Sequence, residues 1–274
     1  MSDIGISSAC YYPLLTEKAF RRVCETGAKT AEIFFNAESE LKPDFLAELN
    51  RIRDFYGVKI ASIHPFSSFM ESNHLFSLYE RRFWDTLELY RRFFEAAQTL
   101  GAPVFVVHGI KKISKSPDEL YFERYRILMD EAKKSGVTFA QENVVLHRGE
   151  SPDYLLKMKD ALGEDFRVVF DLKQARRAQV DIFPALQKLG GLVCHIHVSD
   201  GSQARDCLPP GEGSFDFARL FRVMAACAYR GDYIIELYSD GYASEKQITD
   251  SLAFLKEKQT AALADCSFNE KQKN

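Results

Sequence analysis

Eight short apolar runs, each followed by a longer segment with helical periodicity, constrain the fold of this chain more than any other feature. The runs are DIGISS (3–8), TAEIFF (30–35), VKIASIHPF (58–66), APVFVVHG (102–109), VTFAQENVV (137–145), FRVVFDLK (166–173), LVCHIHVSD (192–200) and DYIIELYS (232–239). This alternation indicates parallel strands joined by crossover helices. The 274 residues, 46% of them apolar, fit one α/β domain over residues 1–274, a single (β/α)8 TIM barrel. A doubly wound sheet would usually offer a glycine-rich phosphate turn after the first strand, and GISSACYYP is not one.

The segments between the runs predict amphipathic helices. The clearest is expected to begin near Ser72 and to stop at Gly101-Ala102-Pro103, with one apolar face that contains Phe76, Phe83, Leu87, Tyr90, Phe94 and Ala97. Further helices are expected to start at Ser116-Pro117-Asp118 and at Ser151-Pro152-Asp153, and one is expected to end at Gly231. The polar tail from about residue 260 is expected to fray.

Composition limits the class of protein. The formal net charge is −3 and no basic block stands out, which argues against a nucleic-acid partner. The N-terminus lacks a basic and then apolar signal-peptide pattern, and no apolar run approaches the roughly 20 residues that span a bilayer. The six cysteines are scattered without a CxxC pair, so we expect free thiols in a cytoplasmic protein with no membrane partner: Cys10, Cys24, Cys194, Cys207, Cys227 and Cys266.

Six consecutive predicted strands end in a side chain that can bind a metal. An unpaired charge inside a buried strand is costly, so Glu142 in VTFAQENVV needs an explanation. In a barrel of this type, the active site lies at the carboxyl ends of the strands, and residue alternation points these side chains inward. They are His64, His108, Glu142, Asp171, His197 and Glu236, on the third to eighth strands.

A divalent cation would relieve the repulsion among three carboxylates at one mouth. Carboxylate and imidazole ligands together suit Mn, Zn, Co or Fe, with Mg possible where water completes the coordination sphere. Taken singly, a histidine at a strand end is more often structural, and a carboxylate there more often caps a helix or binds a backbone amide. Six such residues at equivalent positions favour the metal site.

Three neighbouring residues have simpler interpretations. His195 lies two residues before His197 and is expected to be a hydrogen-bonded core histidine. Asp200 is expected to cap a loop or to support a ligand. Lys173 is expected to be solvated, although it could meet a phosphate or carboxylate of a substrate.

The motifs SIHPF, VVHG, QEN, FDLKQ, HIHVSD, GEGSFDF and YRGDYIIEL, in this order, resemble the xylose-isomerase-like TIM barrels over about residues 4 to 257. That superfamily includes sugar epimerases and isomerases, inosose dehydratases and endonuclease IV. The resemblance to its epimerases implies one metal held by Glu142, Asp171, His197 and Glu236, with Glu142 and Glu236 also the catalytic acid–base pair. It also implies that Arg205 contacts substrate oxygens.

The sequence departs from the family pattern after the sixth strand. The family often has Asp-x-x-His, whereas this chain has Asp171-Leu172-Lys173-Gln174; Gln174 can bind a substrate hydroxyl but is a poor metal ligand. Gln174, Arg205 and Cys207 stand where endonuclease IV would need ligands of its third zinc, so that site is absent and DNA cleavage is disfavoured. His64 and His108 could hold a second metal, or they could bind substrate hydroxyls.

Together these features predict a metal-dependent sugar isomerase or epimerase. A small sugar would chelate the metal, one glutamate would remove the proton next to the carbonyl, and the resulting metal-bound enediolate would be reprotonated by the other. An inosose-type dehydratase, a phosphodiesterase and a non-catalytic sugar sensor are the alternatives. The sugar, its phosphorylation and the identity of the metal stay open, and the resemblance allows a homo-oligomer.

Overall fold

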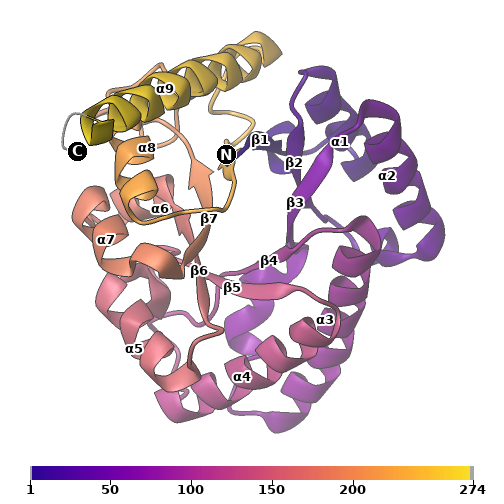
Figure 1. The fold of residues 1–274 in the computed structure, drawn as a ribbon. Helices are drawn as coiled ribbons and strands as arrows, with labels where there is room; N and C mark the ends of the chain where they lie inside the picture. The colour runs from indigo at the N-terminus through magenta and orange to yellow at the C-terminus, as the bar shows by residue number, and fades with distance from the viewer. Residues whose placement is uncertain (1, 272–274) are drawn as a thin grey trace.

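Eight parallel strands form a closed barrel in sequence order, with helices around the outside, in a computed structural model that describes the backbone of residues 2–271 and the side chains of residues 2–264 (Figure 1). The single (β/α)8 TIM barrel predicted from the sequence is therefore confirmed. The strands are β1 (Ile4–Ser7), β2 (Thr30–Phe34), β3 (Lys59–His64), β4 (Val104–Val107), β5 (Thr138–Glu142), β6 (Arg167–Asp171), β7 (Val193–Val198) and β8 (Tyr233–Ile235). Each lies inside one of the eight apolar runs.

The predicted helix starts at residues 116–118 and 151–153 are confirmed, because α4 begins at Asp118 and α5 at Pro152. Pro43 and Pro152 occupy the first turn of α2 and α5, and Gly101 ends α3 in the left-handed conformation. The helices are α1 (Thr16–Glu25), α2 (Pro43–Tyr56), α3 (Glu80–Leu100), α4 (Asp118–Lys134), α5 (Pro152–Leu162), α6 (Leu172–Arg177), α7 (Ile182–Leu189), α8 (Phe217–Ala226) and α9 (Glu245–Lys271). Short 3-10 helices lie at η1 (Ser8–Tyr11), η2 (Glu38–Leu41), η3 (Phe66–Asn73), η4 (Arg148–Glu150) and η5 (Gly190–Leu192).

The prediction that a helix begins near Ser72 is wrong, because α3 starts at Glu80. Ser72 instead lies in the last turn of η3 (Phe66–Asn73) and accepts a hydrogen bond from the backbone nitrogen of Lys111 at 2.6 Å. The carbonyls of Leu75 and Ser77 accept hydrogen bonds from the buried Arg124 guanidinium on α4. These bonds to other elements replace the hydrogen bonds of a helical turn, so residues 74–79 form a loop that is held to α4.

Two other helix ends differ from the sequence interpretation. Helix α8 ends at Ala226, five residues before the predicted Gly231. Helix α9 continues to Lys271 and so includes most of the tail predicted from about residue 260. Ala262 on α9 is 1% exposed, and Gln259 donates a hydrogen bond to the carbonyl of Ser2. Burial of Gln259 and Ala262 holds this part of α9 against the rest of the chain.

Alternation along the strands separates two apolar layers. Val104, Val106, Ala140 and Val169 form a small cluster inside the barrel. Phe105 and Phe139, from the alternate positions of β4 and β5, belong to the larger core between strands and helices. This arrangement confirms the predicted inward direction of β4 and β5, so side chains at their carboxyl ends point to the barrel axis.

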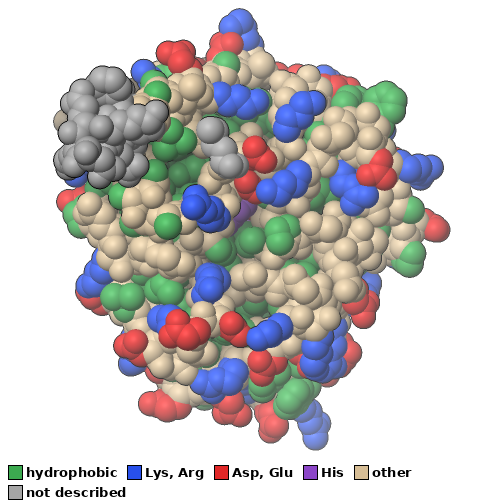
Figure 2. All heavy atoms as spheres, viewed as in Figure 1, with side chains coloured by type: hydrophobic (Ala, Val, Ile, Leu, Met, Phe, Trp, Pro, Cys, Tyr) green, Lys and Arg blue, Asp and Glu red, His purple; other side chains and the backbone are tan. Residues whose placement is uncertain are grey.

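The described residues include no helix that is long and apolar enough to cross a membrane. Cys10, Cys24, Cys194, Cys207 and Cys227 are free thiols, and the side chain of Cys266 lies outside the described part. On the face drawn in Figure 2, basic and acidic side chains are interspersed among the coloured residues rather than gathered into one basic area.

Candidate metal centre

The ends of four consecutive strands bring three carboxylates and one imidazole together. Glu142, Asp171, His197 and Glu236 each offer a ligand atom, and these atoms lie within 4.8 Å of one another. The Nδ1 atom of His197 is 3.4 Å from Glu142 Oε1, 3.8 Å from Asp171 Oδ2 and 3.6 Å from Glu236 Oε2. The structure thus assembles the four residues that the sequence analysis singled out as metal ligands.

The motif Gln141-Glu142-Asn143 fixes the end of β5 on both sides. Gln141 accepts a hydrogen bond from Tyr121 on α4 and donates to the backbone carbonyl of His108. Asn143 bonds to the backbone of Asp171, donating to its carbonyl and accepting from its nitrogen at 2.6 Å. The two amides tie β5 to both neighbouring strand ends, so Glu142 between them is directed to the barrel axis.

The two carboxylate oxygens of Asp171 have different contacts. Its Oδ1 atom accepts a hydrogen bond from the backbone nitrogen of Gln174 at 2.7 Å and so caps helix α6. Its Oδ2 atom faces His197 Nδ1. The cap holds the carboxylate in one orientation, which leaves the second oxygen available at the mouth.

His64 and His108 form a second group with Glu142. Their Nε2 atoms are 3.1 Å apart, and the Oε2 atom of Glu142 lies 3.0 Å from His108 Nε2 and 3.8 Å from His64 Nε2. His64 Nδ1 lies 3.3 Å from the carbonyl of Pro65, which favours a proton on Nδ1 and a lone pair on Nε2. These two imidazoles and one carboxylate could together bind a cation, or they could form hydrogen bonds with substrate hydroxyls.

Burial and neighbouring charges set the protonation of the group. Burial, with the charges of Glu236 and Glu142, raises the pKa of Asp171 to about 6, and Lys173 opposes this shift. Burial also acts to raise the pKa of Glu236, but Lys173 and His197 lower it to about 2. Burial acts to lower the pKa of His197, yet Glu32 and Glu236 hold it well above the usual value.

These residues fit a divalent cation. The Nδ1 atom of His197 is fully buried and makes no hydrogen bond within the described part of the chain, although it points at three carboxylates. An unsatisfied buried nitrogen costs free energy, and coordination would use its lone pair. A mixed set of three oxygens and one nitrogen suits Mn, Fe, Co or Zn, and Mg with water.

Lys173 is not solvated, and the expectation from the sequence is wrong. Its side chain is 3% exposed, and its Nζ atom lies 3.0 Å from Glu236 Oε2 and 3.4 Å from Asp171 Oδ2. The ring of Tyr238 covers the ammonium at 4.6 Å. Lys173 is the second residue of α6, directly after β6, and its side chain lies among the strand-end carboxylates, a contact that the sequence pattern does not encode.

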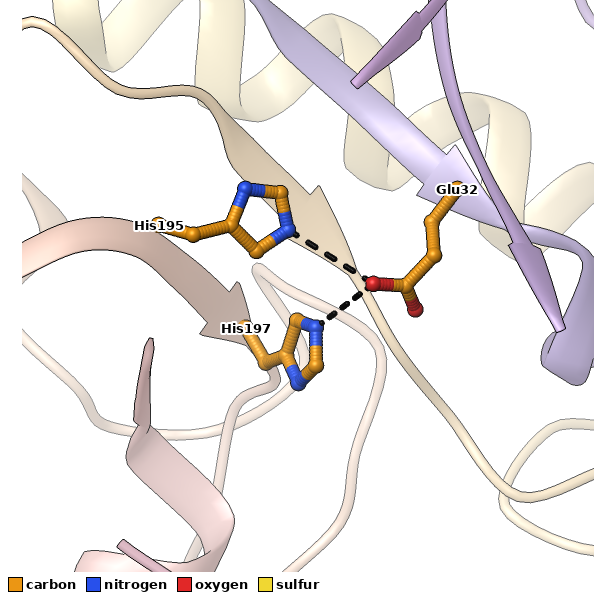
Figure 3. A group of neighbouring side chains, drawn as sticks. All are labelled: Glu32, His195 and His197. Carbon is orange, nitrogen blue, oxygen red and sulfur yellow. Dashed lines mark hydrogen bonds and ion pairs between the residues drawn. The ribbon is translucent and has the colours of Figure 1, made fainter. Parts of the chain in front are cut away.

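Glu32 on β2 is a further site residue that sequence reasoning missed. It is 0% exposed, and its Oε2 atom lies 2.9 Å from His197 Nε2 and 3.6 Å from His195 Nε2 (Figure 3). The signal was a glutamate within the apolar run TAEIFF, the same anomaly as Glu142 in β5. His195 is buried and lies 3.1 Å from the hydroxyl oxygen of Ser62, as expected for a hydrogen-bonded core histidine.

The remaining predicted residues lie around the mouth. Gln174 is buried, and its Oε1 atom accepts a hydrogen bond from the nitrogen of Val145, which leaves its amide nitrogen for a ligand. Arg205 is in the loop between β7 and α8 and lines a cavity of about 490 Å³ with Arg177 and Tyr238. Its guanidinium reaches the carbonyl of Gly241 at 3.4 Å rather than the four-residue group.

Asp200 and His147 lie in loops that follow the barrel strands. Asp200 accepts hydrogen bonds from the backbone nitrogens of Gly201, Gly211, Gly213 and Phe215, which confirms its predicted loop-capping role. His147, in the loop after β5, is 7% exposed with its ring 6.0 Å from that of His108. Burial lowers the pKa of His147 to about 4, so it is a neutral imidazole beside the mouth.

We expect cation affinity to increase with pH. A cation needs the Asp171 carboxylate and a neutral His197, and the raised pKa of each group means that protons occupy them as the pH falls. Titration calorimetry with Mn²⁺ between about pH 5 and pH 8 should show affinity rising by about tenfold per pH unit for each proton displaced. An affinity that does not change across this range would contradict the assignment of these ligands.

Comparison with known proteins gives the family. Residues 20–258 match the family model described as the xylose isomerase-like TIM barrel. An uncharacterized protein of Mycobacterium leprae is 25% identical, and the alignment covers 92% of this chain and 95% of that protein.

Two solved structures are similar over nearly their whole length. A D-tagatose 3-epimerase-like protein has a TM-score of 0.81 at 23% identity and covers 96% of this chain and 99% of its own. A D-psicose 3-epimerase of Clostridium cellulolyticum, solved with D-tagatose, has a TM-score of 0.78 at 15% identity and covers 94% and 99%. With the closed barrel and a family match over residues 20–258, this chain belongs to the xylose isomerase-like TIM barrel family.

Proposed function

We propose that this protein is a divalent-metal-dependent sugar epimerase or isomerase. The observation that carries the proposal is the convergence of Glu142, Asp171, His197 and Glu236 within 4.8 Å at the carboxyl end of the barrel. The sugar epimerases among the similar structures support the same class of substrate.

Glu142, Asp171, His197 and Glu236 would hold the cation. When bound, a divalent cation supplies Lewis-acid polarisation of a substrate carbonyl, which makes the neighbouring C–H bond more acidic. Such help is needed because a glutamate is a weak base towards carbon, and the pKa of Glu236 is further lowered to about 2.

Glu142 and Glu236 are the proposed acid–base pair. They approach His197 Nδ1 from different strands, with Glu142 Oε1 at 3.4 Å and Glu236 Oε2 at 3.6 Å. One group, as the carboxylate, removes the proton next to the carbonyl. The other must enter the step as the carboxylic acid, and it gives its own proton to the opposite face of the same carbon, so the two groups exchange protonation states. Return of the proton to the neighbouring carbon gives an isomer instead.

The surrounding residues orient the sugar. His64 and His108 present imidazole nitrogens beside Glu142, and the Gln174 amide and the Arg205 guanidinium offer hydrogen-bond donors for hydroxyl or carbonyl oxygens. A second cation at His64, His108 and Glu142 would use the same atoms. Metal stoichiometry distinguishes these two uses.

The reaction is tested by incubating the Mn²⁺-loaded protein with a panel of ketoses and inososes in D₂O. The proposal predicts deuterium at the carbon next to the carbonyl and an epimer or isomer as product. Loss of water from an inosose would assign a dehydratase instead. Sugar binding without exchange, with metal present, would contradict catalysis, and tight salt-sensitive DNA binding with more than one metal per chain would indicate a phosphodiesterase.

Replacing Lys173 by Met is expected to strengthen Mn²⁺ binding by about tenfold, because the ammonium competes with the cation for Asp171 and Glu236. Titration calorimetry measures the effect. Lys59→Met is the matched control, since Lys59 is paired with Asp232 outside the metal group. Weaker Mn²⁺ binding in Lys173→Met, with the control unchanged, would instead mean that Lys173 holds the carboxylates in place.

A further inference from the structure

The imidazole of His197 is held between the candidate metal centre and a buried carboxylate on the opposite side of the ring. Its Nδ1 atom faces Glu142, Asp171 and Glu236, whereas its Nε2 atom lies 2.9 Å from Glu32 Oε2 (Figure 3). Glu32 comes from β2 and His197 from β7, so the contact crosses the interior of the barrel.

The contact determines which nitrogen can bind a cation. The Oε2 atom of Glu32 accepts a hydrogen bond from the Ser62 hydroxyl at 2.7 Å and lies 2.9 Å from His197 Nε2. A carboxylate oxygen accepts hydrogen bonds and has no hydrogen of its own to donate to the ring. The hydrogen of the His197–Glu32 bond therefore belongs to Nε2. In the neutral ring the lone pair is then on Nδ1, the atom that faces the candidate ligands.

Glu32 is itself held in place. The Ser62 hydroxyl on β3 donates to the same Oε2 atom at 2.7 Å, and its oxygen lies 3.1 Å from His195 Nε2. Glu32, Ser62 and His195 are each 0–1% exposed, so the carboxylate cannot exchange these partners for solvent. The acceptor atom is fixed relative to three strands.

The buried carboxylate of Glu32 destabilises the folded protein. Glu32 Oε1 is buried and has no hydrogen-bond partner within the described residues. A buried carboxylate with one unsatisfied oxygen is destabilising relative to an apolar side chain of similar size. The stability of the fold therefore does not explain a glutamate at this position. A role in orienting the His197 imidazole does explain it.

We propose that Glu32 is a positioning residue that fixes the Nε2–H tautomer and the ring orientation of His197, and so presents Nδ1 to the catalytic cation. The proposal rests on the metal site described under the proposed function. A carboxylate bonded to the far nitrogen of a histidine ligand also makes the ligand nitrogen more basic, and loss of such a partner typically weakens metal affinity by about 10–100-fold.

The test compares Mn²⁺ affinity, measured by titration calorimetry, in the wild type, Glu32→Leu and Glu32→Gln. Glu32→Leu removes both acceptor and charge and is expected to weaken binding by about 10–100-fold. Glu32→Gln keeps an acceptor and is expected to lose less. Asp232→Asn is the control, because Asp232 is also buried but pairs with Lys59 and contacts no proposed ligand; its Mn²⁺ affinity should equal that of the wild type.

Two further measurements separate positioning from a purely structural role. Thermal melting without metal should show that Glu32→Leu stays folded, and nitrogen NMR of labelled histidine should show His197 as the Nε2–H tautomer in the wild type and as a mixture in Glu32→Leu. Unchanged Mn²⁺ affinity and an unchanged tautomer in Glu32→Leu, with a wild type that binds Mn²⁺, would overturn the inference and leave the proposed function intact. A wild type that binds no Mn²⁺ would overturn both.

Discussion

Replacing Glu236 by Gln is expected to reduce deuterium exchange at the substrate carbon by about 10²–10⁴-fold, the usual contribution of a positioned acid or base. The amide cannot accept the proton, although it occupies nearly the same volume. The fold should be retained, because the backbone nitrogen of Glu236 still donates to the carbonyl of Val198 at 3.1 Å. Exchange is measured by NMR in D₂O at saturating Mn²⁺, which separates lost proton transfer from weakened metal binding.

Glu245→Gln is the control for this variant. Glu245 begins α9, is exposed and pairs with Arg22 on α1, so its loss removes the same charge from the same part of the chain without touching the mouth. Exchange in Glu245→Gln should equal that of the wild type. Undiminished exchange in Glu236→Gln would remove Glu236 from the acid–base role.

Among the substitutions proposed here, Glu142→Gln is expected to reduce Mn²⁺ affinity the most. Glu142 contributes to both cation-competent groups, since Oε1 faces His197 Nδ1 and Oε2 lies 3.0 Å from His108 Nε2. Mn²⁺ affinity should fall by at least about 100-fold, because a charged ligand shared by both groups is neutralised. Exchange should then be lost even at high Mn²⁺, because Glu142 is also one member of the proposed acid–base pair.

Glu40→Gln controls for the removal of a buried carboxylate. Glu40 is 8% exposed, accepts hydrogen bonds from Thr16 and from the nitrogen of Asn36, and belongs to none of the candidate cation groups. It should alter thermal stability but not Mn²⁺ affinity. Wild-type affinity in Glu142→Gln would exclude Glu142 as a ligand.

Strand positions could be predicted because their signal is local. Each strand of the barrel is buried on both sides, so it appears in the sequence as a short apolar run, and a carboxylate in such a run is visible as an anomaly. This reasoning located Glu142, and the identical anomaly in TAEIFF would have located Glu32. Glu32 was nevertheless missed, because it lies in the middle of β2, whereas the active-site residues of such a barrel are expected at the carboxyl ends of its strands.

Helix bounds were less predictable where backbone groups form hydrogen bonds with other parts of the fold instead of within a helix. The periodicity before α3 continues through Phe76, which is buried as an apolar residue should be. Its ring packs on Tyr121 of α4 with centroids 4.5 Å apart, from a loop rather than from a helix. An apolar residue in the sequence indicates that its side chain is buried. It does not show whether the buried side chain comes from a helix or from a loop.

The sequence by itself determined the eight-stranded barrel and the four strand-end residues proposed as metal ligands, because the alternation of apolar runs and the period of two along each strand are properties of the chain. Only the tertiary structure decided that Lys173 enters the mouth and that Glu32 reaches His197, since both contacts join segments far apart in the chain. Their geometry depends on the closure of the barrel, which lets Glu32 on β2 reach His197 on β7 across the interior and lets Lys173 on α6 reach Glu236 directly after β8. No local pattern encodes those distances.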